Sequence, residues 1–394
     1  MRSILNLGLQ PPCVFLDKRA LKEGSERLYP LEICLCGSCG CVQSRNIVNP
    51  RILFGEGYHH IAGIPLSFRA HLGNLATLLS ERFHLGPGDF VVELGSSDGF
   101  LLEKLLHHNV KVLGVEPSSV CDIAKEKGLN TLKVFFDKEE AKNILAHYGR
   151  AKVIVALNTF AHVAALDSFM KGVDLLLDDT GVFVTESHYL LDLITKLQYD
   201  FIYHEHLRYY SLRTLTQLFE LYGMEVFDVE RIPTHSGSLR VYAGKKGVYP
   251  ISDSVGQLLR TEDAAALSSW NNYEEFARRV QSHRAELKNL LVKIKGQGER
   301  IVGVTYPARA VTLLQYCQIG PDILDYVTEG SELKVGKFTP GSHIKIVDES
   351  VIFEDQPDYG LLLSWHLSDE VISKFRARGY KGKFIIPLPT PRIV

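Results

Sequence analysis

From residue 90 onward, short apolar runs alternate with segments of helical periodicity. Buried strands are expected at 90–94, 111–115, 152–157 and 182–185, with a weaker strand near 131–135. Helices are expected between them, at about 99–108, 118–127, 138–147 and 165–178. Because each helix carries the chain back across the sheet, strands in this pattern pair in parallel. The alternation therefore predicts a doubly wound α/β sheet.

The pattern changes after this region. Ser211 is expected to cap a helix that ends at Gly223. Two strands follow, 224–232 and 238–244, and their short connection predicts an antiparallel hairpin at the sheet edge. Residues 246–298 are charged and helical and carry no strand signal.

Strand–helix alternation restarts at residue 300 and continues to 386, which predicts a second, smaller α/β unit. A helix is expected at 66–82, and the residues before it, rich in Pro, Gly, Cys and His, are expected to be irregular. A chain of 394 residues has room for two or three domains. We expect the boundaries to divide it into 1–65, 66–245, 246–298 and 299–394.

Composition excludes several classes of function. The 44 basic and 46 acidic residues give a formal charge of −2, which argues against a nucleic-acid partner. No apolar run approaches the roughly 20 residues of a membrane helix, and the N-terminus is a poor signal peptide. Seven cysteines, four of them within residues 34–41, do not form a disulfide framework. They indicate a reducing compartment, so we expect a cytoplasmic protein, and they suggest a metal site.

The segment VVELGSSDGF (91–100) combines a strand, a tight glycine turn and a helix start. Gly95 lets the backbone approach a ligand, and Gly99 opens the helix. The carboxylates of Glu93 and Asp98 would repel a pyrophosphate but suit a cationic ligand such as S-adenosylmethionine. Glu116, at the end of the next strand, suits the two ribose hydroxyls. A common strand–turn pattern without this ligand, and NAD, are the alternatives; Ser97 and Asp98 displace the third glycine that NAD requires.

Further side chains follow the later strands. Phe135 and Phe136 are candidates to flank an adenine, although two aromatics at a strand end are often simply core residues. Asn158 and His162 lie just beyond the carboxyl end of the fourth strand, where ligands bind in parallel sheets.

The segment DFIYHEHLRYYS (200–211) holds the densest chemistry of the chain. Tyr203, His204, Glu205 and His206 stand in a row in a loop at the carboxyl edge of the sheet. This combination suggests proton transfer, with Tyr as a donor to a developing oxyanion. Two alternatives stay open: a metal held by His204, Glu205 and His206, or a polar loop with satisfied side chains.

These motifs together resemble the S-adenosylmethionine-dependent sugar C-methyltransferases, which act on nucleotide-linked keto-deoxysugars. The resemblance runs over nearly the whole chain, through LNLGLQPP, CGSCGCVQS, VVELGSSDGFLL, VLGVEPSS, NTFAHV, YHEHLRYYS, SLRVYAG and KVGKFTPGSHIKI. It implies a zinc-binding segment at 1–65, a class I methyltransferase domain at 66–245, a helical bridge and a C-terminal Rossmann-like domain that binds the nucleotide sugar.

The resemblance also implies a reaction. A base removes the proton on ring carbon 3 of a dTDP-linked 4-keto-6-deoxy sugar, and the enolate takes the methyl group. His206 would be the base, Tyr203 and Glu205 would orient it and stabilise the enolate, and His162 would lie against the sugar. The implied cofactor positions are Glu93, Gly95, Ser96, Asp98, Gly99, Glu116, Phe135, Phe136 and Asn158.

Three departures from the family qualify the resemblance. The family's zinc site uses two C-x-x-C pairs, and only Cys36 and Cys39 match, although Cys13, Cys34 and Cys41 could substitute for the second pair. Bound zinc and the absence of a metal are both open. Tyr58 and His60 stand where the family has two tyrosines near the substrate. In the last domain, Thr305 replaces a glycine of the glycine-rich turn.

Besides Tyr58 and His60, four residues outside the loop at 200–211 are expected to bind the substrate. Arg309, Lys334 and Lys337 would face the nucleotide diphosphate, with a solvated basic rim as the alternative, and His235 would face the sugar. The prediction is a monomeric enzyme that takes a small-molecule substrate. Its rivals are an O- or N-methyltransferase and a non-catalytic relative that binds the same ligands.

Overall fold

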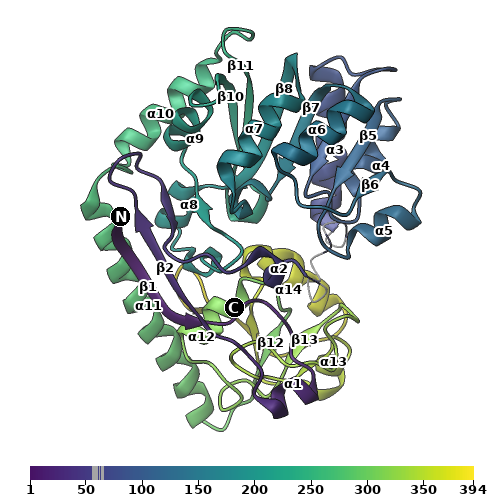
Figure 1. Cartoon of the computed structure of the whole chain (residues 1–394). Helices are drawn as coiled ribbons and strands as arrows, with labels where there is room; N and C mark the ends of the chain where they lie inside the picture. The colour runs from purple at the N-terminus through teal and green to yellow at the C-terminus, as the bar shows by residue number, and fades with distance from the viewer. Residues whose placement is uncertain (56–60, 62, 64–65) are drawn as a thin grey trace.

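The computed structural model describes residues 1–55, 61, 63 and 66–394. Three β-sheets organise this part of the chain (Figure 1). A seven-stranded sheet lies in the upper half of the view, a six-stranded sheet in the lower half, and a four-stranded sheet formed largely by the N-terminus lies beside both.

The seven-stranded sheet has the order β10-β11-β8-β7-β4-β5-β6. Its strands are β4 (Phe90–Leu94), β5 (Lys111–Val115), β6 (Thr131–Leu132), β7 (Ala151–Leu157), β8 (Leu177–His188), β10 (Met224–Ile232) and β11 (Ser238–Lys245). All pairings are parallel except the two made by β11. The predicted doubly wound sheet with an antiparallel edge hairpin is therefore confirmed.

Helices cover both faces of this sheet. One face packs against α3 (Leu66–Arg82) and α4 (Phe100–Leu106), through strand residues such as Val91 and Val153. The other face packs against α6 (Lys138–Tyr148), α7 (Leu166–Leu176) and α9 (Leu212–Glu220), through Val92 and Ile154. Adjacent residues of a strand thus reach opposite layers, as the two-residue period of a β-strand requires. The remaining helix of the alternation is α5 (Cys121–Glu126).

The six-stranded sheet has the order β14-β13-β12-β15-β16-β17. Its strands are β12 (Ile301–Val304), β13 (Val327–Glu329), β14 (Ile346–Asp348), β15 (Tyr359–Leu362), β16 (Lys383–Ile386) and β17 (Arg392–Ile393), with helices α12 (Ala310–Tyr316), α13 (Val351–Asp355) and α14 (Ser368–Ala377). Only the pairing of β16 with β17 is antiparallel in this sheet. The second α/β unit is confirmed.

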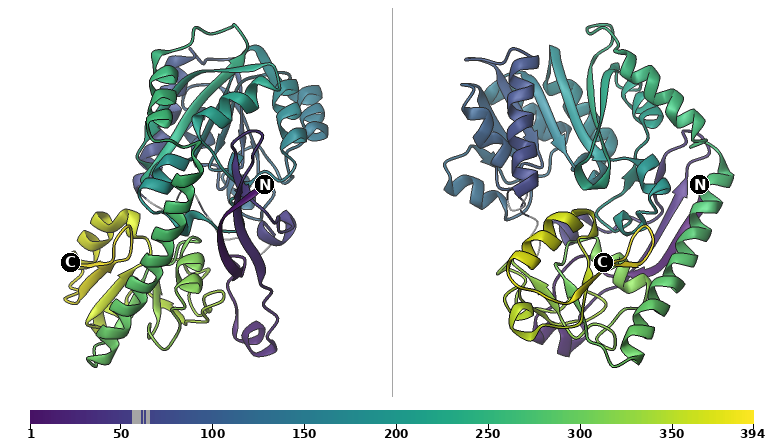
Figure 2. Two further views of the ribbon diagram at one scale, coloured as in Figure 1. Left: turned by 90° about the vertical axis from the view of Figure 1, so that its left-hand side faces the viewer. Right: turned by 180° about the vertical axis from the view of Figure 1, so that it is seen from behind.

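The expected helical bridge consists of α10 (Asp253–Ala264) and the long helix α11 (Trp270–Gly296). The buried residues of α11 recur every three to four positions, so one stripe of the helix packs inward along its whole length. Figure 2 shows α11 running from the upper sheet down the side of the lower unit, next to strand β1. The domain boundaries drawn from the sequence stay a prediction.

The expectation of an irregular N-terminal segment is wrong. Strands β1 (Arg2–Gln10), β2 (Tyr29–Leu35) and β3 (Val42–Ser44) form an antiparallel sheet, and β9 (Arg208–Tyr209) adds its fourth strand. Two register shifts in the β1–β2 pairing break the two-residue alternation by which a strand is recognised. The sheet matters for function, because β9 begins two residues after His206. Within the described ranges, no helix is both long and apolar enough to cross a membrane.

Candidate active site

A cavity of about 430 Å³ lies at the carboxyl ends of the parallel strands of the central sheet, within the size range of small-molecule sites. Its wall includes most of the residues singled out in the sequence. These are Glu93, Gly95, Ser96, Glu116, Phe135, Phe136, Asn158, His162, Tyr203, Glu205, His206 and His235. Side chains from four strand ends and from the loop before β9 thus meet at one place.

The glycine turn after β4 approaches the cavity with its backbone. Gly95 has a φ of +77° and its N–H donates to the carbonyl of Val115 at 2.7 Å. A Cβ atom at this position would lie 2.0 Å from Oγ1 of Thr159. Only glycine fits here, because both the left-handed backbone and the contact with Thr159 exclude a side chain.

Two buried carboxylates flank this turn. Glu116 accepts hydrogen bonds from the backbone N–H groups of Ser97 at 3.1 Å and Ser118 at 2.9 Å, and these bonds hold it at the cavity wall. Burial and the nearby charges of Asp98 and Glu116 raise the pKa of Glu93 well above its ordinary value. Oε2 of Glu93 is buried, and the described residues offer it no hydrogen-bond partner. A cationic ligand beside Glu93 would relieve both the burial and the repulsion, so these residues fit the aminoacyl end of S-adenosylmethionine.

Other expected cofactor residues hold the turn or complete the wall. Asp98 is buried away from the cavity wall, where Oδ1 accepts from the N–H of Gly63 at 3.1 Å and Oδ2 pairs with Lys127 at 3.3 Å. Gly99 caps the start of α4 behind the turn. Phe135 is 44% exposed at the cavity, whereas Phe136 packs against Phe169 of the core.

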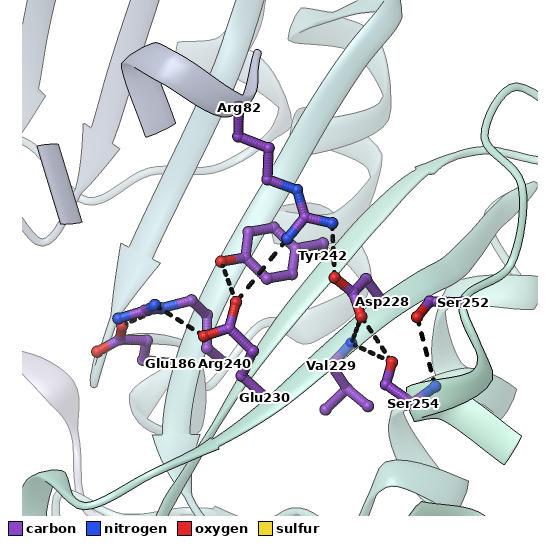
Figure 3. A network of polar contacts seen from close by, with 9 residues as sticks. All are labelled: Arg82, Glu186, Asp228, Val229, Glu230, Arg240, Tyr242, Ser252 and Ser254. Carbon is purple, nitrogen blue, oxygen red and sulfur yellow. Dashed lines mark hydrogen bonds and ion pairs between the residues drawn. The ribbon is translucent and has the colours of Figure 1, made fainter. Parts of the chain in front are cut away.

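Asn158 follows β7 with a φ of +52°, a conformation that asparagine tolerates better than most residues. Its N–H donates to the carbonyl of Glu186 at the end of β8. Glu186 itself is fully buried and is held by Arg240 at 2.7 Å and His71 at 2.8 Å. Figure 3 shows how this network continues through Glu230 and Tyr242 to Arg82 and Asp228. The polar network thus braces the strand whose last residues, Ser187 and His188, line the cavity.

His206 is held in a defined tautomer. Its Nδ1 lies 2.9 Å from the carbonyl oxygen of Phe201, and since a carbonyl only accepts, Nδ1 carries the proton. Nε2 is then an acceptor, and the phenol oxygen of Tyr203 lies 2.9 Å from it. Burial lowers the pKa of His206 well below its ordinary value. The imidazole is therefore neutral at neutral pH and has the form that a general base requires.

Glu205 is buried beside this pair and is one of the residues that line the cavity. Burial raises its pKa to about 7. Its Oε2 makes no hydrogen bond to any of the described residues. A carboxyl group poised between its two forms near neutral pH can donate a proton or a hydrogen bond to a ligand oxygen.

Two further imidazoles complete this end of the cavity. His162, in the turn η1 (Phe160–His162), stacks on Phe54 and lies 5.0 Å from the ring of His206. His235 has a φ of +53° in the turn between β10 and β11, and its ring lies between those of Phe68 and Phe201. The sequence reasoning missed Phe68, His188 and Phe201 as cavity residues. Of these three residues, His188 could have been predicted at the cavity, because it lies at the carboxyl end of a strand that pairs in parallel, where ligands bind.

The structure does not bring His204 to the cavity. Its Nε2 donates to the carbonyl of Gln10 at 2.9 Å, which ties the loop to the end of β1. Among the residues with a described position, no group of three or more His, Cys, Asp or Glu is placed to hold a metal ion. The alternative of a metal held by His204, Glu205 and His206 therefore finds no support.

Cys36 and Cys39 lie in the turn between β2 and β3, away from the cavity. Hydrogen bonds from the backbone N–H groups of Cys39 and Ser38 lower the pKa of the Cys36 thiol. The nearby Cys34 is buried and accepts from Nε of Arg45 at 3.2 Å instead. Cys41 interacts electrostatically with both of these thiols, but no group of three or more potential ligands among the described residues is placed to hold a metal ion, so they do not fit a complete structural zinc site.

The three basic residues expected at the nucleotide, Arg309, Lys334 and Lys337, differ in how deeply they are buried and in their partners. Arg309 is buried and pairs with Asp200 at 2.6 Å, so it is not on an open rim. Lys334 donates to Glu329 and to the carbonyl of Tyr306, both at 3.0 Å, and Lys337 is half-buried. Tyr58 and His60 lie outside the described residues.

Comparison with known proteins agrees with this geometry. Three family models match successive parts of the chain. A putative zinc binding domain matches residues 1–54, a methyltransferase domain matches 68–229, and a C-methyltransferase C-terminal domain matches 233–389. The segment matched by the zinc-binding model holds five cysteines, of which Cys36 and Cys39 have the C-x-x-C spacing.

Among curated proteins, the C-methyltransferase NovU of Streptomyces niveus is 33% identical over 94% of this chain and 89% of its own length. Solved structures match less of the chain. The match to magnesium protoporphyrin IX methyltransferase of Synechocystis, with bound S-adenosylmethionine, covers 50% of this chain and 89% of the enzyme's chain. The sequence identity is 14% and the TM-score is 0.35. The match to an S-adenosylmethionine-dependent methyltransferase of Clostridium acetobutylicum covers 45% of this chain and 92% of the other chain, at 14% identity and a TM-score of 0.36. By its similarity to NovU along nearly its whole length, the chain belongs to the S-adenosylmethionine-dependent C-methyltransferase family.

Proposed function

We propose that the protein methylates ring carbon 3 of a dTDP-linked 4-keto-6-deoxy sugar through an enolate. The observation that carries this proposal is the neutral His206, whose Nε2 is an acceptor beside the phenol of Tyr203 in the cavity that Glu93 and Glu116 also line. The proton beside a ketone is acidified by the carbonyl group. One base and a pair of oxyanion donors are therefore sufficient for this chemistry.

The carboxylates of the central sheet hold the cofactor in this proposal. Glu116 accepts from the ribose hydroxyls, Glu93 faces the cationic aminoacyl end, and Phe135 covers the adenine. When bound there, S-adenosylmethionine supplies a methyl group attached to a sulfonium sulfur, and the leaving group is a neutral thioether. The protein therefore has to activate only the carbon nucleophile.

The loop before β9 performs that activation. Nε2 of His206 takes the proton from carbon 3, and the C–H electron pair becomes the carbon–carbon double bond of the enolate. Nδ1–H of the imidazolium continues to donate to the carbonyl of Phe201, so the ring does not have to turn. Tyr203 and the protonated form of Glu205 donate hydrogen bonds to the enolate oxygen. Carbon 3 then forms a bond to the methyl group in place of the C–H bond that it lost.

The remaining wall residues set the position of the sugar. The ring of His162 lies 5.0 Å from that of His206, and the ring of His235, in the β10–β11 turn, lies 6.3 Å from that of Phe201. We place the sugar between these imidazoles, and the diphosphate toward Lys334 and Lys337 of the C-terminal unit.

The test is a turnover assay with S-adenosylmethionine and a dTDP-4-keto-6-deoxyhexose. The expected product carries one additional methyl group on carbon, identified by mass spectrometry and by NMR. A methyl group on oxygen or nitrogen would overturn the proposal.

A second assay isolates the enolate. With the keto-sugar in D₂O and no cofactor, the wild-type protein should exchange the proton on carbon 3, and His206→Ala should not. An O- or N-methyltransferase needs no enolate and would show no exchange in either protein. A non-catalytic relative would bind the ligands without exchange or transfer.

A further inference from the structure

The tautomer of His206 depends on the carbonyl of Phe201, and three side chains of the C-terminal unit hold the segment that carries it. Oδ2 of Asp200 accepts from Nε of Arg309 at 2.6 Å and from Nε1 of Trp365 at 2.8 Å. Oγ1 of Thr312 donates to the carbonyl of Ile202 at 2.7 Å. These bonds fix the residues on both sides of Phe201.

Arg309 is the centre of this arrangement. Its guanidinium carbon lies 3.8 Å from the ring centroid of Phe201 and 4.5 Å from that of Trp365, so the cation is packed between two aromatic faces. The side chains of Arg309 and Asp200 are 4% and 1% exposed. Nη1 and Nη2 of Arg309 are buried without a hydrogen-bond partner among the described residues. The pairing with Asp200 is therefore the principal compensation for burying this charge.

Phe201 passes this restraint to the catalytic loop. Its carbonyl accepts from Nδ1 of His206 at 2.9 Å, and its ring stacks on that of His206 at 12° between planes. The ring of His188 stacks on it at 3.9 Å between centroids. A shift of Phe201 would remove the acceptor that keeps the proton on Nδ1, and the imidazole would be free to place that proton on Nε2.

We propose that Arg309, in the C-terminal unit, is a positioning residue. It holds Asp200 and Phe201 in place, so that Nε2 of His206 stays unprotonated and directed at Tyr203. The inference rests on the role of His206 as base in the proposed function. It replaces the expectation that Arg309 binds the diphosphate, and it makes the C-terminal unit part of the catalytic machinery as well as a cover for the substrate.

The test compares Arg309→Met with the wild type, because methionine fills the space between the two rings without the Nε donor or the charge. The readout is the tautomer of His206, observed by NMR of ¹⁵N-labelled histidine without cofactor or substrate and assigned with His206→Gln. We expect the wild type to show the Nδ1–H form alone and Arg309→Met to show a mixture with the Nε2–H form. The kcat should fall about 10- to 100-fold, with little change in the KM of the sugar.

Asp200→Asn is the second variant, because it keeps the shape and an acceptor but removes the charge that Arg309 needs. It should give the same mixture of tautomers, and the double variant should be no worse than either single one. Arg309→Lys, which restores a cation, should recover part of the kcat. Tyr380→Phe is the matched control: it removes a buried hydrogen bond to Pro357 within the same unit, and it should leave the His206 spectrum unchanged.

The inference is overturned if folded Arg309→Met or Asp200→Asn keeps the wild-type tautomer. It is also overturned if Arg309→Met raises the KM of the sugar many-fold at an unchanged kcat, because that result identifies a substrate ligand. The tautomer is measured without turnover, so the inference is judged separately from the proposed methylation of a keto-sugar.

Discussion

The phenol oxygen of Tyr203 lies 2.9 Å from Nε2 of His206, on the side of the imidazole opposite the carbonyl that holds Nδ1. This pair predicts the effect of removing the base. His206→Ala should abolish methyl transfer, a loss of at least about 100-fold, and should leave the affinity for S-adenosylmethionine unchanged. Transfer is measured by mass spectrometry and cofactor affinity by calorimetry. Loss of both methyl transfer and S-adenosylmethionine binding would mean that His206 belongs to the cofactor site.

Tyr203→Phe tests the other half of the pair. Without the hydroxyl group, one oxyanion donor is lost and Nε2 of His206 keeps its lone pair. The kcat should fall by about 10²- to 10³-fold, the loss seen when one such donor is removed, while the variant stays folded. An unchanged kcat would exclude Tyr203 from stabilising the enolate.

The pKa of Glu205 predicts a pH limb for turnover. Burial raises this pKa to about 7, so the carboxyl group is protonated below that pH and ionised above it. If the protonated form donates to the enolate, kcat falls as the pH rises through about 7. In Glu205→Gln, the amide N–H donates at every pH and this limb should disappear. An identical limb in both proteins would assign it to another group.

The buried ion pair of Arg240 and Glu186 predicts a difference in stability. Their side chains are 7% and 0% exposed (Figure 3). In Arg240→Leu, His71 would be the one remaining side-chain partner of the Glu186 carboxylate among the described residues. We expect the free energy of unfolding to fall by about 3–5 kcal/mol in urea titrations. The control is Arg213→Ala, which breaks an exposed pair with Asp263, 43% and 61% exposed, and should cost about 0–1 kcal/mol. Equal losses would show that burial does not determine the cost.

Much of the fold follows from periodicity. Strands β4 and β5 and helix α3 have the predicted bounds, because their apolar spacing has no competing interpretation. The β1–β2 pairing was missed, because its register shifts hide the alternation. The cavity residues with a chemical signature, such as His206 and Glu93, could be found from the sequence.

The contacts of Arg309 could not be found in this way. A basic residue beside a glycine-rich turn suggests a phosphate ligand, and its partner Asp200 lies 109 positions away in the chain. Only the packing of the C-terminal unit against the central domain brings the two together. Residues whose role depends on tertiary contacts of this kind give no signal in the local pattern.

The buried histidines predict loss of stability in acid. Burial lowers the pKa of His188 to about 3 and lowers those of His204, His206, His283 and His366, so the folded protein takes up protons on these rings at a lower pH than the unfolded chain does. In the unfolded chain they take up protons as the pH falls through about 6.5. The unfolded state then binds more protons, and the free energy of unfolding must decrease as the pH falls below this value.

Glu93, Glu205 and Glu262 act in the opposite sense, because burial raises their pKa values and the folded state then binds additional protons at a higher pH than the unfolded chain does. Five histidines outweigh three carboxyl groups, so we expect the free energy of unfolding to fall by about 3–5 kcal/mol between pH 7 and 5, at roughly 1.4 kcal/mol per proton and pH unit. Chemical unfolding at a series of pH values measures the slope. His283 does not line the cavity, and His283→Gln removes one of these protons, so the slope should become flatter by up to one proton. A slope that is the same in both proteins would mean that His283 is already protonated in the folded state.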